Sequence, residues 1–274
     1  MRVTVLSSGS AGNAILVEAD GTCVLIDAGL QPRDLSRRMQ RSAGSARLED
    51  VGAILCTHEH GDHGGGVPAL ASAGLAVYAT EGTSRALGLG GALTIAAGSR
   101  FTVGALTVEP VAMPHDASEP VGFIVDDGDG RAGFITDCGH PAASVAAAFA
   151  SCDVLLLETN YDHDLLRAGP YPPGLKRRIA GRHGHLSNGD AAELLRMMRP
   201  PRLQVLILAH LSEENNQPRL ARTTVERTLR DIGARPRVLV AGQSKPLAPI
   251  SCRGGTASVL PGIDDRQLRF AFSD

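Results

Sequence analysis

The stretch His58-Glu59-His60-Gly61-Asp62-His63 places four potential metal ligands within six residues, directly after the apolar run Ala53-Ile54-Leu55-Cys56. Packing does not require three histidines and an aspartate there, whereas imidazole nitrogens and carboxylate oxygens are the usual ligands of zinc, manganese and iron. Alternate residues of an extended loop face the same way, so His58 and His60 can bind one ion. Asp62 and His63 follow where the chain turns and can reach a second. Two ions about 3.5–4 Å apart form a hydrolytic centre that activates water.

Length and composition predict one globular domain over residues 1–274, with 43% apolar and 20% charged residues. The net charge of −2 excludes attraction of the whole molecule to nucleic acid, so contact with a polyanion must come from a local patch. The five cysteines are scattered and form no C-x-x-C pair, which is typical of reduced cysteines in the cytoplasm. No signal-peptide core precedes the first strand, and no stretch approaches the ~20 apolar residues of a membrane span. We therefore expect a cytoplasmic protein with no membrane partner.

Apolar runs separated by Gly, Pro, Asn and Asp predict alternating strands and helices, and a mixed α/β architecture of four layers. The turn at 126–130 is a strong hairpin signal, and Asn188 is placed to cap the helix that follows it. The predicted strands cover residues 3–6, 14–18, 23–27, 51–56, 75–78, 101–103, 106–111, 121–125, 133–136, 154–157, 205–209 and 237–241. The predicted helices cover residues 33–41, 67–73, 142–150, 190–198 and 223–232.

Four ligands cannot complete two metal sites, so further ligands are expected elsewhere in the chain. His115, Asp137 and His210 each come just after an apolar predicted strand. The ends of strands are where α/β sheets place their chemistry. A single histidine in such a position is more often structural, but three such residues in a chain with the first cluster favour additional ligands.

These positions resemble the metallo-β-lactamase superfamily, in which H-x-H-x-D-H is followed by a His, an Asp and a final His. The resemblance implies a four-layer αββα sandwich with a dinuclear site between its two sheets. It assigns His58, His60 and His115 to one ion and Asp62, His63 and His210 to the other. Asp137 would bridge both ions, since a carboxylate offers two oxygens. A hydroxide held between the two ions would be the nucleophile.

Two further motifs, Leu157-Glu158-Thr159-Asn160 and Gly184-His185-Leu186-Ser187, resemble the HEAT and HST motifs of tRNase Z type phosphodiesterases. That resemblance implies that Glu158 orients His185, which protonates the leaving oxygen. A carboxylate beside a histidine raises the pKa of the imidazole toward this role. Leu186 departs from the second motif, and a purely structural His185 at the start of the next helix is the alternative. The candidate catalytic residues are Asp62, Glu158 and His185.

A Gly/Ser loop and a basic stretch are the candidate phosphate-binding segments. The loop at 7–13 lies between two predicted strands, where backbone N–H groups and hydroxyls can form an anion nest, although many such loops are simple turns. The stretch at 170–179 concentrates positive charge, which indicates either a phosphate-binding strip or a solvated helix face. The candidate residues are Ser8, Ser10, Asn13, Lys176, Arg177 and Arg178.

Seven motifs together closely resemble those of the YycJ/WalJ-like family of single-domain bacterial proteins. They are S-G-S-x-G-N, T-H-E-H-x-D-H, H-D-A-x-E-P-V-G, T-D-x-G-H, L-K-R-R-I, G-H-L-S-N-x-D-A-A-E-L and L-A-H-L-S-x-E-N-N. The resemblance covers roughly residues 1–230. It implies a metal-dependent phosphodiester hydrolase, a 5′→3′ exonuclease acting on DNA rather than RNA with two divalent ions, Zn²⁺ or Mn²⁺, with iron as a further option. The alternatives are a phosphodiesterase for small cyclic phosphates, another hydrolase of this fold, and a non-catalytic metal-binding regulatory module. The oligomeric state stays open.

Four more positions carry weaker expectations. Asp27 can orient a metal-binding histidine or simply form a turn. His140 is a candidate for substrate contact, and Asn215 and Asn216 are candidates for fixing the loop after His210. Cys138 is not expected to be a ligand, because the residues around it already complete the set.

Overall fold

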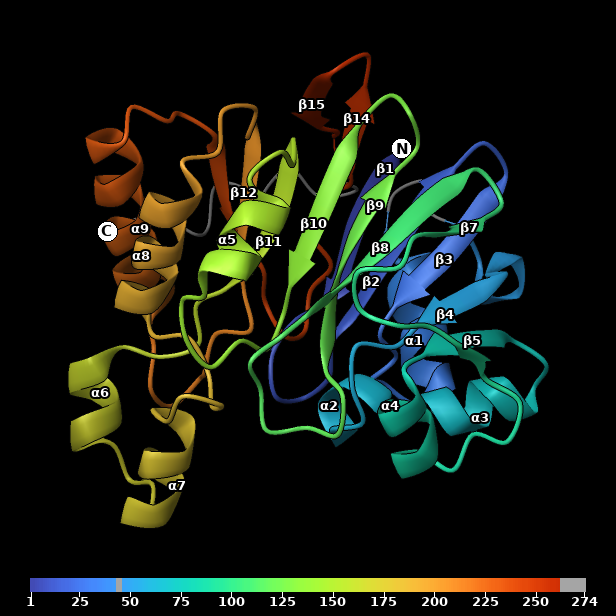
Figure 1. Cartoon of the computed structure of the whole chain (residues 1–274), viewed down its shortest axis with the longest axis horizontal. Coiled ribbons are helices and arrows are strands. Elements are labelled where there is room, and N and C mark those ends of the chain that lie inside the picture. Colours follow the sequence, from blue (N-terminus) through green and yellow to red (C-terminus); the bar gives the residue numbers. More distant parts are fainter. Residues whose placement is uncertain (43–45, 262–274) are drawn as a thin grey trace.

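The computed structural model describes residues 1–42 and 46–261. Two β-sheets lie face to face, and helices cover the outer face of each sheet (Figure 1). The layers therefore follow the order α, β, β, α, and the sandwich predicted from the sequence is confirmed.

The first sheet is formed mainly by the beginning of the chain. Its described strands are β1 (Arg2–Ser7), β2 (Ala14–Ala19), β3 (Thr22–Ile26), β4 (Ala53–Leu55), β5 (Ala76–Ala79), β6 (Leu93–Thr94), β14 (Ile250–Arg253) and β15 (Thr256–Val259). They lie in the order β15-β14-β1-β2-β3-β4-β5-β6. Strands β3 to β6 run parallel, so β4 ends at the same edge of the sheet as β3 and β5.

The second sheet carries most of the remaining strands. These are β7 (Phe101–Val103), β8 (Leu106–Ala112), β9 (Val121–Asp126), β10 (Arg131–Ile135), β11 (Val154–Glu158), β12 (Val205–Ala209) and β13 (Arg237–Val240). The described strands lie in the order β13-β12-β11-β10-β9-β8-β7. Strands β10 to β13 are parallel, and β9 is antiparallel to both of its neighbours. The carboxyl ends of β8, β10, β11 and β12 therefore meet at one edge.

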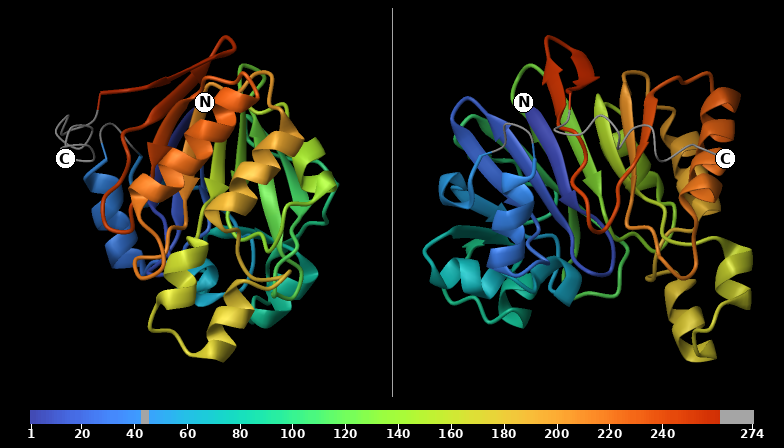
Figure 2. Two further views of the ribbon diagram at one scale, coloured as in Figure 1. Left: turned by 90° about the vertical axis from the view of Figure 1, so that its left-hand side faces the viewer. Right: turned by 180° about the vertical axis from the view of Figure 1, so that it is seen from behind.

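The helices form the two outer layers and the rim of that edge. They are α1 (Pro32–Gln40), the 3₁₀ helix η1 (Leu48–Asp50), α2 (Gly61–Gly64), α3 (Val67–Ser72), α4 (Glu81–Ala86), α5 (Ala143–Phe149), α6 (His163–Ala168), α7 (Pro173–Ile179), α8 (Asn188–Met198) and α9 (Pro218–Asp231). Helices α1 and α3 pack on the first sheet, and α5, α8 and α9 pack on the second. Helices α6 and α7 extend from the body of the molecule (Figure 2).

Strand β2 illustrates why the chain forms this sandwich. Its side chains alternate, so Ile15 and Val17 enter the core between the two sheets while Leu16 enters the core under α1. A strand that is buried on both faces is apolar at nearly every position. The continuous apolar runs of the sequence therefore specify central strands with helices on the outer faces.

Every strand and helix predicted from the sequence has a counterpart at nearly the same position, and β9 and β10 form the predicted hairpin. The predicted cap was wrong: Asn188 is already inside α8, and the Ser187 hydroxyl accepts the hydrogen bond from the Asp190 amide. Serine caps better here because Asp190 reciprocates by accepting from the Ser187 amide, which completes a capping box. No helix in residues 1–42 or 46–261 combines the length and apolar character that crossing a membrane requires.

Candidate metal centre and proton relay

The seven ligands predicted from the sequence come together at the edge where the two sheets meet. Each of them follows a strand or lies in the short helix next to one, which is where the chain leaves a sheet. The loop after β4 supplies His58 and His60, α2 supplies Asp62 and His63, and the loops after β8, β10 and β12 supply His115, Asp137 and His210. The ligands therefore come from both sheets and both halves of the chain.

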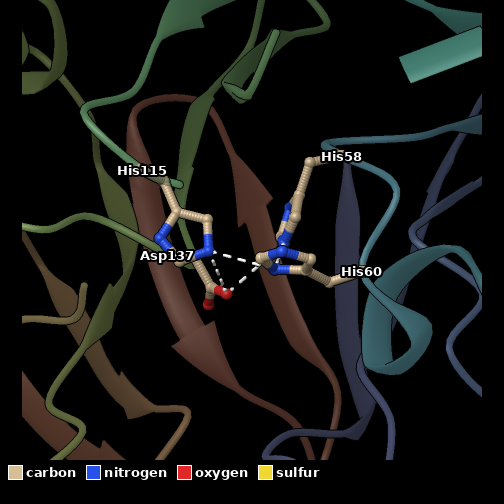
Figure 3. A group of neighbouring side chains, drawn as sticks. All are labelled: His58, His60, His115 and Asp137. Carbon is tan, nitrogen blue, oxygen red and sulfur yellow. Dashed lines mark hydrogen bonds and ion pairs between the residues drawn. The ribbon is translucent and has the colours of Figure 1, made fainter. Parts of the chain in front are cut away.

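His58, His60, His115 and Asp137 form the first group, with one nitrogen or oxygen from each lying within 4.8 Å of the others. Figure 3 shows the four side chains pointing toward one another, with His58 and His60 facing His115 and Asp137. His60 Nδ1 lies 3.1 Å from His58 Nε2 and 3.2 Å from His115 Nε2. Asp137 Oδ2 lies 3.4 Å from His58 Nε2 and 3.3 Å from His115 Nε2.

Asp62, His63 and His210 form the second group. His210 Nε2 lies 3.1 Å and His63 Nε2 lies 3.7 Å from Asp62 Oδ2. The other oxygen of Asp137 faces this group, since Oδ1 lies 3.5 Å from His63 Nε2 and 3.3 Å from His210 Nδ1. Asp137 thus stands between the two groups with one oxygen toward each.

Two observations show that these residues fit divalent ions. Asp137 Oδ1 is buried and accepts no hydrogen bond from any described residue, although buried polar atoms normally have a partner. His60 Nδ1 has two ring nitrogens at hydrogen-bonding distance, but one ring nitrogen carries only one proton or one lone pair. These ring nitrogens lie close together, but they do not carry enough protons to hydrogen-bond to one another. Such an arrangement suits ligands of a common cation.

The electrostatics of the centre agree with this fit. Burial lowers the pKa of His58, His60 and His115, which favours the neutral imidazole that binds metals. Burial also opposes a charge on His210, but the carboxylates of Asp137 and Asp62 outweigh it and raise the pKa of His210 to about 10. A centre that draws protons onto buried histidines has an excess of negative charge, which divalent ions would balance.

Asp27 fixes the orientation of His63. Its Oδ2 atom accepts a hydrogen bond from His63 Nδ1 at 2.7 Å, so the opposite nitrogen, Nε2, faces the second group. Thr57 donates to the same carboxylate through its backbone amide at 2.8 Å and through its hydroxyl at 2.9 Å. Asp27 has a φ of 59°, in the left-handed region that few residues other than Gly, Asn and Asp adopt. Of the two sequence interpretations, the geometry favours orientation of a histidine.

His210 is held in a similar way by residues far away in the sequence. The Ser8 hydroxyl accepts a hydrogen bond from the His210 amide at 2.8 Å, and Asn160 Nδ2 donates to the His210 carbonyl at 2.9 Å. These contacts stabilise His210 at a φ of 56°. The strained backbone turns the side chain back toward Asp62 immediately after β12.

A close approach of two backbones positions the loop that carries Asp62. A Cβ atom at Gly29 would lie 1.8 Å from the Asp62 carbonyl oxygen, so only glycine fits there. The same carbonyl accepts a hydrogen bond from the Asn13 amide at 2.7 Å, and the Asn13 side chain lies 3.0 Å from His63 Nε2. Through Asn13, the Gly/Ser loop therefore holds the loop that carries Asp62 and His63 in place.

Glu158 and His185 form a hydrogen-bonded pair next to the metal centre, as the resemblance implied. Glu158 is fully buried, and its Oε1 atom accepts from His185 Nδ1 at 2.7 Å. Its Oε2 atom accepts from the backbone amides of Cys138 at 2.8 Å and Leu186 at 3.2 Å. Burial opposes a charge on His185, but Glu158 and Asp137 outweigh it and raise the pKa of His185. The pair can therefore hold a proton beside the metal ligands.

The candidate phosphate-binding residues do not all face the site. Ser8 and Asn13 are buried and bond to the centre itself, while Ser10 and Arg178 line a cavity beside His185. The remaining two candidates, Lys176 and Arg177, are not in the lining of that cavity, and Lys176 Nζ donates to the Arg167 carbonyl.

The weaker expectations have mixed outcomes. His140 Nδ1 donates to the Arg182 carbonyl at 2.8 Å, and His140 belongs to neither ligand group. Asn216 is buried and bonds to Asn188 and to the Thr159 carbonyl, which anchors the loop after His210. Cys138 belongs to neither ligand group, and its thiol donates to the His140 carbonyl.

Sequence reasoning missed the roles of Thr57 and Asn160. Thr57 bonds to Asp27 and its hydroxyl lies 3.0 Å from His58 Nδ1. Asn160 bonds to the backbone of His210. Both residues stand inside motifs already quoted, T-H-E-H and L-E-T-N, so their place beside the ligands was the available signal.

Comparisons with known proteins agree with this geometry. A model of the β-lactamase superfamily domain matches residues 22–210. Exodeoxyribonuclease YycJ of Bacillus anthracis is 34% identical over 241 residues, which cover 85% of this chain and 90% of that protein. Exodeoxyribonuclease WalJ of Streptococcus pneumoniae is 34% identical over 234 residues, which cover 82% and 86%. The crystal structure of the metallo-β-lactamase fold protein YhfI from Bacillus subtilis matches with a TM-score of 0.68 at 17% identity, over 89% of this chain and 97% of that chain, and this match shows the fold alone.

Proposed function

The chain belongs to the metallo-β-lactamase superfamily and, within it, to the family of YycJ and WalJ, and on this premise we propose that it is a metal-dependent exodeoxyribonuclease. The family predicted from the motifs is thereby confirmed. The proposal includes two divalent ions, zinc or manganese, and single-stranded or duplex DNA digested from the 5′ end. It also treats residues 1–274 as one domain that works in the cytoplasm.

One observation carries the proposal: a proton-holding pair stands directly beside two groups of metal ligands. Asp137, Glu158, His185 and His210 offer atoms that lie within 4.8 Å of one another. Hydrolysis of a thioester needs little acid assistance, because a thiolate is a stable leaving group. An alkoxide leaving group needs a general acid. The pair therefore favours a phosphodiester with a sugar oxygen as the leaving group.

The two ligand groups define what the chain would hold. One ion would be held by His58, His60 and His115. The other would be held by Asp62, His63 and His210, and Asp137 would contribute to both sites. When bound, the ions supply an activated water molecule and positive charge to neutralise the phosphate oxygens. The contribution of the chain is orientation, since Asp27 and Ser8 keep two of the histidines turned toward the centre.

His185 would act on the side of the phosphorus atom opposite the attacking water. Glu158 binds Nδ1 of the imidazole, which leaves Nε2 to donate a proton to the departing sugar oxygen. The raised pKa of His185 favours retention of that proton until the sugar oxygen departs. After the bond from phosphorus to the sugar oxygen breaks, the products are a new 5′-phosphate and a new 3′-hydroxyl.

The test is digestion of DNA and RNA strands labelled at either end, single-stranded and duplex, with Mn²⁺ or Zn²⁺ present. We expect stepwise shortening of DNA from the 5′ end that stops when a chelator is added. Failure to cleave any strand, with cleavage of a small cyclic phosphate instead, would replace the proposal by its main alternative. Metal bound without hydrolysis of either substrate class would indicate a regulatory module.

A further inference from the structure

A cavity of about 200 Å³ adjoins His185 outside the two groups of metal ligands. Its walls come from the Gly/Ser loop, the loops after β8, β11 and β12, the segment between α6 and α7, helix α7 and the segment that leads into α8. The residues that matter below are Ser10, Asp116, Tyr171, Leu175 and Arg178. The cavity therefore lies between His185 and helix α7, one of the two helices that extend from the body of the molecule.

The position of His185 determines which part of a substrate would enter this cavity. A proton donor must lie next to the oxygen that departs, so the space on its side receives the leaving part of the substrate. When water forms its bond to phosphorus and the bond to O3′ breaks, His185 gives its proton to O3′. The leaving part then ends in a 3′-hydroxyl at His185, and its 5′ end lies deeper in the cavity.

Arg178 supplies a cation for that 5′ end. Its Nε atom donates to Asp116 Oδ2 at 2.6 Å, which fixes the plane of the guanidinium. The two terminal nitrogens of Arg178 bond to none of the described residues, so their N–H groups are available to a ligand. A planar guanidinium with two parallel donors matches a terminal phosphate. The Ser10 hydroxyl is exposed in the same lining and adds a further donor.

Tyr171 supplies a surface for a base. Among the described residues it is the one phenyl or phenol ring that is neither buried nor packed against a core cluster. Leu175, one turn along the same segment, is 38% exposed and lines the same cavity. Aromatic and apolar side chains beside a positively charged group are the usual platform on which nucleic-acid bases stack.

We propose that this cavity binds the 5′-terminal nucleotide of a DNA strand, with Arg178 on its terminal phosphate and Tyr171 against its base. The inference rests on the proposed function, because it assigns the leaving side of that reaction. It makes Arg178 and Tyr171 specificity-determining residues and gives a physical reason for digestion from the 5′ end. Asp116 is then a positioning residue that acts through Arg178.

The first test measures cleavage of DNA that carries either a 5′-phosphate or a 5′-hydroxyl. The wild-type enzyme should prefer the 5′-phosphate by about tenfold in kcat/KM and should release deoxynucleoside 5′-monophosphates. Arg178→Ala should reduce that preference to about twofold or less. The matched control is Arg167→Ala, which removes another arginine paired with an aspartate, Asp164, on neighbouring α6 and outside the cavity. Equal cleavage of both ends by the wild type, or equal loss in both variants, would overturn the proposal.

The second test measures binding of thymidine 5′-monophosphate and thymidine to the metal-loaded enzyme by calorimetry. The monophosphate should bind about tenfold more tightly, and Arg178→Ala should remove the difference. Tyr171→Leu should weaken both ligands by about tenfold. A preference that survives in Arg178→Ala would mean that the phosphate binds the metal centre, and the proposal fails. If no DNA is cleaved while the monophosphate still binds through Arg178, the proposed nuclease function fails and the nucleotide pocket stands.

Discussion

Glu158→Gln separates the proposed proton relay from a structural role, because it keeps the shape of the side chain and removes its charge. Glu158 Oε2 accepts hydrogen bonds from the amides of Cys138 and Leu186. Its Oε1 atom lies 2.7 Å from His185 Nδ1 and 3.3 Å from His210 Nδ1. A carboxamide has only one oxygen, which the two amides will claim, so its NH₂ group must face the two imidazoles.

The size of the effect follows from that exchange. His185 loses its charged acceptor, and a hydrogen bond to a charged group contributes about 1.5–3 kcal/mol. At 1.4 kcal/mol per factor of ten, the protonated imidazole becomes about 10–150 times less favoured. We expect kcat for DNA to fall about 100-fold, within the range that general acid catalysis contributes.

The assay compares DNA with a phosphodiester whose leaving group is an activated phenol. The aryl substrate does not need a proton at its departing oxygen, so its kcat should fall less than about fivefold. Glu193→Gln, an exposed glutamate on α8 that pairs with Arg196, serves as the matched control. Metal content should stay unchanged. Equal losses for both substrates, together with lost metal, would mean that Glu158 acts by holding His210, and the relay would be refuted.

Three further changes test the centre and its supports. Asp137→Ala should abolish hydrolysis and lower the bound metal per chain in elemental analysis, and wild-type turnover would contradict the assignment. Gly29→Ala should lower the free energy of unfolding by about 3 kcal/mol in urea, since its Cβ would meet the Asp62 carbonyl, whereas Gly90→Ala has open space around it. Burial raises the pKa of Cys23 to about 12. All five cysteines are buried and free, so thiol reagents at pH 8 should react only after unfolding, and rapid labelling of the native protein would count against the structure.

The sequence predicted the central strands well because their side chains are buried on both faces. Strands such as β11 and β12 are apolar at almost every position, so the pattern is unambiguous. Helix α6 was not predicted, and α7 was considered only as one interpretation of the basic stretch, since Leu166 is the one buried residue within these two helices. Short helices without an apolar stripe leave no periodic signal. The hairpin of β14 and β15 was also missed, although Gly254-Gly255 at its turn has the positive φ angles that favour one.

The ligands could be predicted because they either cluster at residues 58–63 or come just after a predicted strand, but their supports could not. Ser8 and the amide of His210 are 202 positions apart, and only the assembled sheets bring them together. From the sequence alone, a serine in a Gly/Ser loop is equally compatible with a contact to phosphate and with a support for a metal ligand. Asp27 was recognised as ambiguous for the same reason, since its φ of 59° and its contact with His63 belong to the tertiary structure.

The distribution of the ligands over both halves of the chain also bears on how the protein matures. His210 follows Asp62 by 148 positions, so the ribosome completes the first loop long before the last ligand exists. A nascent chain therefore exposes a histidine-rich fragment without a complete cage for an ion. If the ions bind as proposed, the two sheets must meet before the metals can be retained. The metal supply of the cell would then act after the two sheets have met, and it would control how much of the folded protein is active.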